Sequence, residues 1–338
     1  MKSMNIIINA SGAKAGGAKT IVETFFRWLE DNDQHNSYIF IVGFPLSTKS
    51  NNIEVVYLPT NSLSSLLFST IGVSYYCLKY RTNIVLSFMN MNTILPFMKR
   101  ITYFHQALLF SLDIPKFRIY KLIIKSQRKS YFITQTEVVK NNLGNLLHSK
   151  TADISITTVW PGVAVPNDIN SPDWYDSNDF INSKMALCPY TSIDFDYKNF
   201  EKIYNSYSFF KENNIKVVIT ADTNKYMDND VFKFVGNCTL SEIHFLYKTA
   251  DMVLFPSKHE TVGLPIFESL YHGTPVILEN VEYVRDIKNK FPYLAIIIDD
   301  NLTYSFSVDV LSKIEYDRDL ECFKGEWEKV LRLVNAFS

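Results

Sequence analysis

The order strand, loop, helix, strand between residues 252 and 278 constrains the fold of this chain more than any other stretch. Met252–Phe255 is an apolar run of strand length, and Pro275–Leu278 forms a second. Pro265 suits the first helical position, where its missing N–H would be unpaired anyway, and Gly273 suits the residue just past the helix end, where φ is positive. Two strands connected by a helix indicate a parallel sheet.

Two carboxylates belong to this unit. Glu260 lies in the loop that follows the first strand, and Glu268 lies in or near the first turn of the helix. In open α/β sheets, ligands bind at the carboxyl ends of the strands. The spacing therefore predicts that both acids lie at a ligand-binding edge.

The same alternation of strands and helices occurs twice along the chain. A break falls at Val159–Pro166, which contains two prolines and a glycine and is followed by a polar run. We predict an α/β fold with two Rossmann-like domains facing a cleft, at residues 1–163 and 164–318. Leu320, Phe323, Trp327, Leu331 and Val334 recur at helical spacing and predict a helix from about Asp319 to Ala336, within a final segment 319–338.

Length and composition agree with two domains and exclude several classes of protein. The 338 residues are 47% hydrophobic, which is long for one core. The four cysteines show no metal-ligand spacing and are read as reduced thiols. No secretory signal is expected at the start, and no run reaches the roughly 20 apolar residues of a membrane span. The nearest run, Leu63 to Leu78, is interrupted by serines and is predicted to be a buried helix.

The charge is unevenly distributed. Residues 1–165 have 17 Lys+Arg and 8 Asp+Glu, a net of +9, whereas residues 166–338 have 17 and 27, a net of −10. The two halves are therefore expected to have different partners, and the basic half is expected to face something anionic.

The region from about Phe234 to Asp286 resembles the family 4 retaining glycosyltransferases of the GT-B fold. Their signature is a pair of glutamates in a Pro-Ser-x-x-Glu-x-x-Gly-Leu-Pro-x-x-Glu frame, present here from Pro256 to Glu268. Val235-Gly236 upstream and Gly273–Val276 downstream match the family as well. The resemblance implies that the first domain binds the acceptor, that the second binds a nucleotide-sugar, and that the final helix crosses back to the first domain.

The resemblance also implies roles for the signature residues. Glu268 would accept hydrogen bonds from the ribose hydroxyls, and Glu260 would contact the hydroxyls of the donor sugar. The backbone of Val262, Gly263 and Leu264 would approach the donor. Glycine-lined loops and helix N-termini supply N–H groups for phosphates. A solvated helix start with ordinary N-terminal acids is the alternative interpretation.

Lys198 resembles the lysine that binds the donor diphosphate in this family. The family usually has an arginine a few residues earlier, but Leu187–Asp194 contains none. Lys258 is a candidate substitute because it is close to the signature. The alternative for Lys198 is an ordinary surface lysine.

Three residues of the first half are further candidates. Gly16 and Gly17 follow the first strand and precede a helix, which suits close approach of the backbone to a substrate, although turns use this pair often. His105 follows the strand Ile101–Phe104 and resembles the histidine that many GT-B transferases hold beside the reacting sugar. A hydrogen-bonded histidine at a strand end is the alternative.

The implied reaction needs neither a metal nor a cofactor. The family mechanism is a same-face substitution in which the leaving diphosphate helps to deprotonate the acceptor hydroxyl. Glu260, His105 and Lys198 are the candidate catalytic residues, acting by positioning and by stabilising the diphosphate. The sequence has no Asp-x-Asp motif that would bind a metal.

The segment Lys116–Lys129 has six cations and no acid. Arg118, Lys121, Lys125 and Arg128 fall on one helical face, which suits an anionic lipid surface, with a solvated helix face as the alternative. The motifs of nucleic-acid binding are absent, so no nucleic-acid partner is expected.

We therefore expect a cytoplasmic enzyme, peripheral at the inner face of the membrane. It would transfer a sugar from a nucleotide-sugar to a glycan or lipid-linked oligosaccharide in surface-polysaccharide synthesis. The alternatives are another GT-B activity, such as an epimerase or a phosphorylase, and a catalytically silent subunit that activates a partner transferase.

Overall fold

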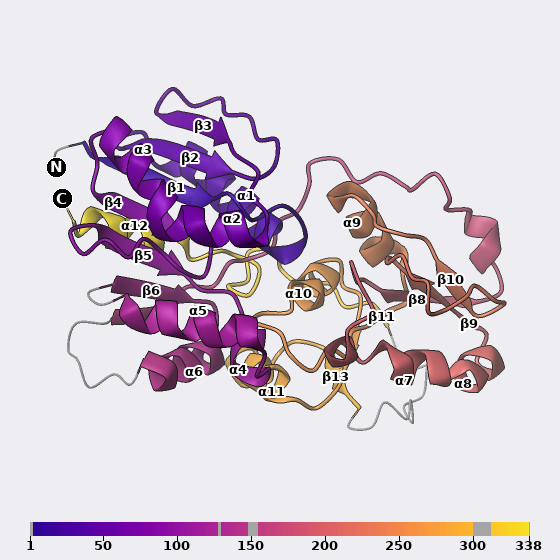
Figure 1. Ribbon diagram of the computed structural model, residues 1–338. Helices are drawn as coiled ribbons and strands as arrows, with labels where there is room; N and C mark the ends of the chain where they lie inside the picture. Colours follow the sequence, from indigo (N-terminus) through magenta and orange to yellow (C-terminus); the bar gives the residue numbers. More distant parts are fainter. Residues whose placement is uncertain (1–2, 128–129, 148–154, 300–311, 338) are drawn as a thin grey trace. The chain divides into compact units, whose positions relative to one another are not determined.

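The computed structural model describes residues 3–127, 130–147, 155–299 and 312–337. The chain divides into two compact units. Unit 1 consists of Met1–Pro161 and Gly325–Ser338, and unit 2 consists of Gly162–Lys324. Each unit contains one parallel sheet with helices against it (Figure 1).

The sheet of unit 1 has seven parallel strands. Their spatial order is β3 (Ile53–Tyr57), β2 (Ser37–Val42), β1 (Asn5–Ala10), β4 (Ile84–Ser87), β5 (Lys99–Tyr103), β6 (Ser130–Thr134) and β7 (Ser155–Thr158). The order runs outward in both directions from β1 and β4, so the strand order reverses there. The loops that follow β1 and β4 therefore diverge at the carboxyl edge, which is where such sheets bind ligands.

Helices cover both faces of this sheet. Helix α1 (Gly16–Asn32) and helix α12 (Trp327–Asn335) lie on one face. The other face carries α2 (Ser62–Leu67), η1 (Phe68–Gly72), α3 (Val73–Lys79), α5 (Pro115–Ser126) and α6 (Glu137–Leu147), with the short α4 (Leu108–Ser111) before α5. Crossovers between parallel strands are right-handed, so the direction in which the chain crosses the sheet decides which face the connecting helix covers. The chain crosses in one direction from β1 to β2. It crosses in the opposite direction from β3 to β4 and from β5 to β7. Figure 1 shows α2, α3, α5 and α6 on the near face of the sheet.

The segment from Leu63 to Leu78 is helical, as expected, but only one side of it is buried. Val73 and Cys77 pack against Ile7 and other residues of β1, β2 and β4. The outward side carries large apolar residues that are between 55% and 76% exposed: Leu63, Leu67, Ile71, Tyr75 and Leu78. The prediction of a buried helix is therefore wrong for this side, because the sheet covers only the opposite one.

The last helix is shorter than the periodicity predicted. Residues 318–324 form turns and bends, and α12 begins at Trp327. The Trp327 ring is buried against Phe25 of α1 and Tyr103 of β5, with ring centroids 5.3 and 5.8 Å apart. This aromatic contact joins the C-terminal helix to the core of unit 1.

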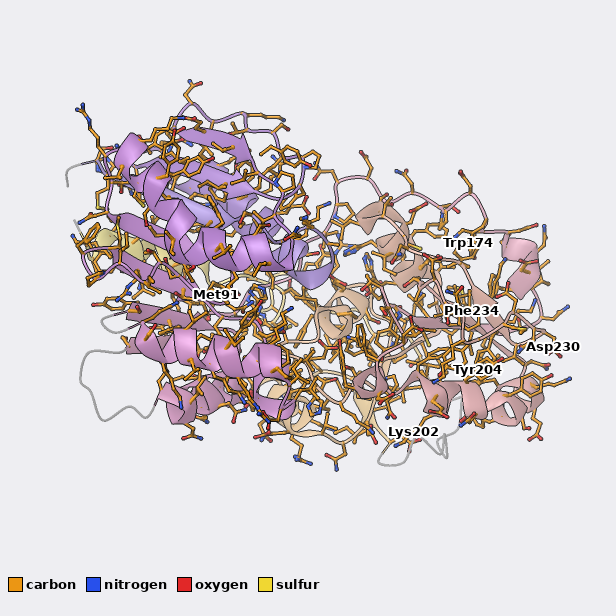
Figure 2. The ribbon with its side chains drawn as sticks, viewed as in Figure 1. Met91, Trp174, Lys202, Tyr204, Asp230 and Phe234 are labelled. Carbon is orange, nitrogen blue, oxygen red and sulfur yellow. The ribbon has the colours of Figure 1, made fainter. Side chains whose placement is uncertain are left out.

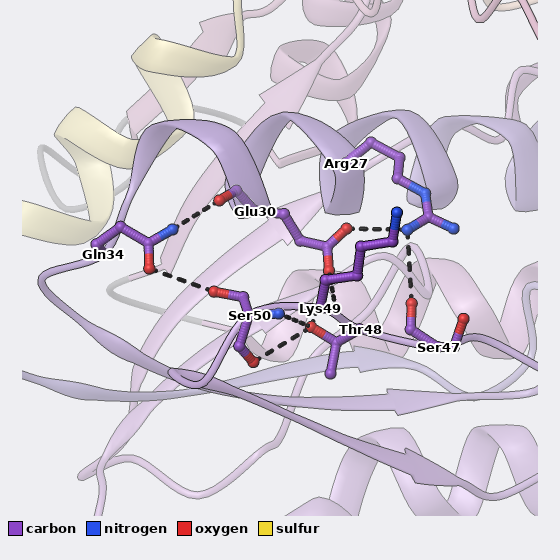
Figure 3. Close-up of polar contacts among 7 residues, drawn as sticks. All are labelled: Arg27, Glu30, Gln34, Ser47, Thr48, Lys49 and Ser50. Carbon is purple, nitrogen blue, oxygen red and sulfur yellow. Dashed lines mark hydrogen bonds and ion pairs between the residues drawn. The ribbon is translucent and has the colours of Figure 1, made fainter. Parts of the chain in front are cut away.

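A polar cluster joins α1 to the loop before β3 (Figure 3). Glu30 accepts hydrogen bonds from the Thr48 hydroxyl at 2.8 Å and the Lys49 N–H at 2.9 Å, and it pairs with Arg27 at 2.9 Å. Burial raises the pKa of Glu30, but these hydrogen bonds and the Arg27 charge outweigh burial and leave that pKa below its usual value. The cluster fixes the loop and so sets the entry into the edge strand β3.

Unit 2 repeats the plan with six parallel strands. Their order is β10 (Phe232–Phe234), β9 (Ile215–Ile219), β8 (Lys184–Cys188), β11 (Met252–Leu254), β12 (Val276–Leu278) and β13 (Ile296–Ile298). The order reverses between β8 and β11, so their carboxyl ends mark the ligand-binding edge. The helices between them are α7 (Phe200–Asn205), α8 (Tyr207–Glu212), α9 (Leu240–Thr249), α10 (Leu264–Tyr271) and α11 (Glu282–Lys290), and two 3₁₀ turns are η2 (Ser177–Phe180) and η3 (Asp196–Lys198).

In unit 2, rings from the first helices and the edge strands pack together. Tyr204 of α7 contacts Phe232 of β10 with centroids 4.9 Å apart, and Phe234 stacks near Tyr226 at 6.4 Å. Tyr204 and Phe234 are labelled in Figure 2, which draws them in the same part of unit 2. The described parts of the chain contain no helix of the length and apolar character that a membrane span requires.

Candidate functional site

The loop between β11 and α10 holds the signature residues of unit 2. Gly263 has φ +71°, in the left-handed region, and directly precedes α10. A Cβ at Gly263 would lie 2.8 Å from the Cδ1 atom of Ile266, so a larger residue would be both strained and crowded. Pro265 lies in the first turn of α10, as the sequence predicted.

Glu260 lies in this loop and forms an ion pair with Lys198. The Lys198 Nζ is 2.6 Å from Glu260 Oε1, and the Ser257 hydroxyl donates to the same oxygen at 2.8 Å. The two charged side chains are only 17% and 20% exposed, so water screens the pair weakly. The structure thus brings together two residues that the sequence singled out separately, and it adds Ser257, for which the sequence predicted no contact.

Aromatic rings surround the Lys198 ammonium. Its Nζ lies 5.3 Å from the Tyr190 ring centroid, 5.2 Å from Tyr197 and 5.8 Å from Phe255. The Tyr190 hydroxyl also donates to the Lys198 carbonyl at 3.2 Å. Rings that face a cation stabilise its charge and restrict its position. The position of the Lys198 ammonium is therefore restricted by its ion pair and by these rings, unlike that of an ordinary surface lysine.

Backbone contacts connect the Lys198 turn to the Glu260 loop. The Lys258 N–H donates to the Tyr197 carbonyl at 2.8 Å, and the Tyr283 hydroxyl of α11 donates to the Ser257 carbonyl at 2.9 Å. These bonds fix the loop on both sides. The Lys258 side chain, the candidate substitute for the absent arginine, is exposed.

A second charged cluster lies just after Lys198. Asn199, with φ +57°, donates to Glu279 at 2.6 Å, and Lys202 pairs with the other oxygen of Glu279 at 2.6 Å. Lys202 is labelled in Figure 2. The sequence analysis did not identify Glu279. Its position directly after β12, at the carboxyl edge, was the available signal.

Glu268 lies on α10 and is 7% exposed. The Tyr247 hydroxyl of α9 donates to Glu268 Oε2 at 3.0 Å. Burial raises the pKa of Glu268 to about 7, with the Tyr247 hydrogen bond opposing the shift. A carboxylate held there needs hydrogen-bond donors, and a vicinal diol would supply two.

A histidine pair fastens α9 to the end of α10. His244 Nδ1 and His272 Nε2 are 2.8 Å apart, and burial lowers the pKa of both imidazoles to about 4. Both rings are neutral at pH 7. The pair and the Tyr247–Glu268 hydrogen bond together set the position of Glu268 relative to α9.

The remaining candidates belong to unit 1. Gly16 begins α1 with φ +60°, and Gly17 follows within the helix. The backbone N–H of His105 donates to Asn90 Oδ1 at 2.6 Å, and its buried ring Nδ1 has no hydrogen-bond partner among the described residues. Burial lowers the pKa of His105 to about 4, so its ring is neutral at pH 7.

The basic face on α5 is only partly available. Arg118 forms a two-bond pair with Asp113, at 2.9 and 2.7 Å. Lys121 is half-buried and Lys125 is exposed, while Arg128 lies outside the described residues. In the part of the chain that the structure describes, no group of three or more His, Cys, Asp or Glu side chains is arranged to hold a metal ion.

Comparisons with known proteins identify the class of fold and a family domain. The chain has the GT-B fold, as expected, with two Rossmann-like parallel-sheet domains. Residues 195–301 match the family model described as glycosyl transferases group 1. The matched model and the fold together support a glycosyltransferase of the GT-B kind. No curated protein sequence matches the chain.

Three solved structures illustrate the likeness of fold. WaaG, a glycosyltransferase involved in lipopolysaccharide biosynthesis, superposes with a TM-score of 0.61 and 12% identity over 91% of this chain and 88% of its own. Sucrose-phosphate synthase from Thermosynechococcus elongatus has a TM-score of 0.65 and 13% identity over 99% and 90%. Anabaena HepE, in complex with UDP and glucose, has a TM-score of 0.55 and 12% identity over 84% and 83%.

Proposed function

We propose that the chain is a retaining, metal-independent glycosyltransferase. It transfers a sugar from a nucleotide-sugar to a hydroxyl of a lipid-linked glycan during surface-polysaccharide synthesis. The observation that carries the proposal is the Lys198–Glu260 pair at the carboxyl edge of unit 2, next to the left-handed Gly263 turn. The binding of UDP and glucose by HepE and the involvement of WaaG in lipopolysaccharide biosynthesis agree with it.

The geometry suits the donor roles that the resemblance implies. An ammonium has three N–H donors, and Lys198 uses one for Glu260, so it can also bind a phosphate oxygen. Within the described residues Glu260 Oε2 makes no hydrogen bond, so it can accept one from a sugar hydroxyl. Glu268 Oε1 is likewise available for the ribose, and the backbone of Val262, Gly263 and Leu264 approaches the donor.

The proposed reaction breaks the bond between the sugar C1 and the diphosphate oxygen and forms a bond from C1 to the acceptor oxygen on the same face. The acceptor proton passes to the leaving diphosphate. Lys198 stabilises the charge that develops on that diphosphate, and Glu260 orients the sugar. His105 is assigned to the reacting sugar, and Gly16 and Gly17 are assigned to donor binding, where their backbone would lie close to the donor phosphate.

The proposal includes a place for the enzyme. On α5, the anionic inner face of the membrane would be contacted by the exposed Lys125 and the half-buried Lys121. Arg118 would join this contact while it is paired with Asp113 at the surface. Arg128 belongs to the same predicted contact. The protein would then be cytoplasmic and peripheral.

Donor binding and turnover test the proposal separately. Thermal-shift measurements with UDP-, GDP-, dTDP- and ADP-sugars should show stabilisation of a few kcal/mol by one class at saturating concentration. Glu260→Gln should abolish turnover of that donor, whereas Glu201→Gln, at an exposed position on α7, should leave it unchanged. NMR of the product should show the anomeric configuration of the donor.

Three results would overturn parts of the proposal. A product with inverted configuration would exclude the retaining mechanism. Tight donor binding with no turnover of any donor in the wild type would favour the catalytically silent subunit. Conversion of the free nucleotide-sugar into its epimer would favour a GT-B epimerase.

A further inference from the structure

A polar pocket opens at the carboxyl edge of the sheet in unit 1, separate from the residues assigned to the donor. Its cavity volume is about 480 Å³. Loops after β1, β3, β4 and β5 contribute Lys14, Asn61, Asn90 and Gln106, and the helices α2 and α5 contribute Ser65 and Lys116. Met91 also lines it, and Figure 2 labels this residue between α2 and α5.

The charge of the lining has one sign. Its two charged residues, Lys14 and Lys116, are both cations, and no carboxylate lines the pocket. Neither lysine makes an ion pair with any residue that the structure describes. The uncharged amides and hydroxyls around them supply further hydrogen-bond donors. A pocket of this composition favours a compact anion such as a phosphate group.

The two helices that form its walls have apolar outer sides. Ser65 and Leu66 of α2 and Ser69 of η1 face the pocket, while Leu67 and Ile71 are 55% and 57% exposed. On α5, Lys116 and Tyr120 line the pocket, while Ile119 and Leu122 are 52% and 67% exposed. Both helices lie on the same face of the sheet, as Figure 1 shows.

The apolar surface on the first of these helices is long and uncharged. Leu63, Leu67, Ile71 and Tyr75 recur at every fourth residue, and Leu78 continues the line. The helical run Ser62–Lys79 contains a single charged residue, Lys79, and at 1.5 Å per residue it is about 27 Å long. We call these five residues the apolar stripe.

The surrounding charges favour a lipid surface over a protein partner. From Ser62 to Ser126 the sequence has one acid, Asp113, and Arg118 already pairs with it. The exposed or half-buried cations of the same stretch are Lys79, Arg81, Lys99, Lys116, Arg118, Lys121 and Lys125, whereas Arg100 is buried. Outside this stretch, Glu54 of β3 accepts a hydrogen bond from the Tyr80 hydroxyl, near the end of the run. Exposed apolar side chains beside an excess of cations are typical of helices that lie in an anionic membrane interface.

We infer that this pocket binds the phosphate of a membrane lipid, with the apolar stripe and the outer side of α5 in the acyl-chain boundary. Lys14 and Lys116 would bind the phosphate. The groups attached to that phosphate, the lipid chain and any glycan, would extend out of the pocket through its mouth. The inference rests on the proposed transfer to a lipid-linked glycan, and it names the chemistry by which unit 1 would recognise that acceptor.

Vesicle sedimentation tests the inference with the full chain. Three preparations are compared: phosphatidylcholine alone, phosphatidylcholine with phosphatidylglycerol, and phosphatidylcholine with a polyprenyl phosphate. Wild type should bind the polyprenyl phosphate vesicles most tightly. Lys14→Met and Lys116→Met should each weaken that binding about fivefold, and Lys14→Arg and Lys116→Arg should restore most of it.

The matched controls distinguish an effect of general surface charge from an effect of binding at the pocket. Lys49→Met removes an exposed cation elsewhere in unit 1 and should have no selective effect on the lipid phosphate. The double variant Leu67→Ser with Ile71→Ser should weaken binding to all three preparations, whereas Met227→Ser, at a 78% exposed position of unit 2, should not. Melting temperatures within error of wild type confirm that each variant folds.

Several results would overturn the inference. Equal effects of Lys49→Met and Lys116→Met would reduce the contact to general surface charge. Competition by inorganic phosphate without any vesicle binding would identify a soluble anion instead of a lipid. A dimer dissociated by the two serine substitutions would assign the stripe to a second copy of the chain.

The proposed function is judged by a different measurement. Sedimentation requires no donor and no turnover. Transfer to a soluble glycan without vesicle binding would leave the transferase proposal standing and reject the lipid site. Vesicle binding without donor turnover would support the lipid site and reject the transferase proposal.

Discussion

The two units share a parallel-sheet plan, but the charges at their carboxyl edges are arranged differently. In unit 2, Lys198 and Glu260 neutralise each other at 2.6 Å, and Lys202 pairs with Glu279. In unit 1 the pocket presents Lys14 and Lys116 with no carboxylate in its lining. The comparison shows that one architecture can present either a self-paired polar site or a site of one charge, depending on the loops and the helix starts at that edge.

The difference has a physical consequence for binding. A paired cation and carboxylate can offer both a donor and an acceptor, which suits a ligand with phosphates and hydroxyls. Cations without a partner attract anions over a longer range and with stronger salt dependence. We therefore expect contacts in unit 2 to depend on geometry and contacts in unit 1 to depend on ionic strength.

The largest expected effect comes from breaking the pair in unit 2. Lys198→Met should lower kcat by about a hundredfold to a thousandfold, because it removes a cation that stabilises the developing diphosphate charge. Turnover of the donor found by thermal shift is the measurement. Lys211→Met is the matched control, since it breaks an ion pair of 3.0 Å with Asp230, a residue labelled in Figure 2. Equal losses in both variants would show that Lys198 acts only through folding.

The next effect is a pH dependence of stability from Glu268. The carboxyl has an ordinary pKa of 4.5 when unfolded and a pKa of about 7 when folded. The folded state therefore holds the proton more tightly, so its stabilising contribution is present below pH 4.5 and is lost as the pH rises through 7. The free energy of unfolding of wild type relative to Glu268→Gln should fall by about 3 kcal/mol across this range.

Chemical denaturation of both proteins from pH 4.5 to 8 measures this difference. His244 and His272, whose pKa values are lowered to about 4, contribute a slope of the opposite sign, but both proteins contain them and the difference removes their effect. A constant difference across the range would contradict the burial of an ionisable Glu268. A saturating nucleotide-sugar should shift the midpoint to lower pH if the ribose binds the ionised form.

A smaller effect on the free energy of unfolding is expected from replacing the glycine at each of two helix starts, one at the carboxyl edge of each unit. Gly16 and Gly263 both have positive φ, but a Cβ at Gly16 would meet no atom within 4 Å, whereas one at Gly263 would meet Ile266 at 2.8 Å. Gly16→Ala should cost about 1 kcal/mol from backbone strain. Gly263→Ala should cost about 1–3 kcal/mol more because of crowding. Equal losses in denaturation experiments would show that Ile266 moves aside freely.

The smallest effect on the free energy of unfolding is expected from changing the N-terminal caps of two helices. In unit 2, Thr239 and Glu242 form a reciprocal capping box at the start of α9, whereas Ala15 makes no side-chain cap for α1 in unit 1. Thr239→Ala should lower the free energy of unfolding by about 1 kcal/mol, and Ala15→Ser should raise it by a similar or smaller amount. Thermal melting of both variants tests the pair, and destabilisation by Ala15→Ser would contradict the extended backbone at that residue.

Much of the backbone was predictable because its patterns are local. The strand at Val276–Leu278 and the helix beginning at Leu264 agree with the predicted ranges to within one or two residues. The strands β6 and β7 were not predicted. Ser155–Thr158 has one large apolar residue, which is too few for a periodic signal, and only its parallel pairing with β6 makes it a strand.

The site was predictable as a set of residues but not as a set of contacts. Glu260 and Lys198 were identified separately, and they are 62 residues apart in the sequence. Their contact depends on β8 and β11 being neighbours in the sheet, which no local pattern specifies. Burial of His105 and Glu268, and so their pKa values, depends in the same way on packing between distant segments.

The sequence by itself determined the alternation of strands and helices, the glycine turn before α10 and the acids around it, because these follow from backbone geometry and residue type over a few positions. Only the tertiary structure decided that Lys198 faces Glu260, that one side of the helical run Leu63–Leu78 stays exposed, and that two lysines share an acid-free pocket. Periodicity shows which residues share a face, whereas strand order and layer packing decide what that face meets.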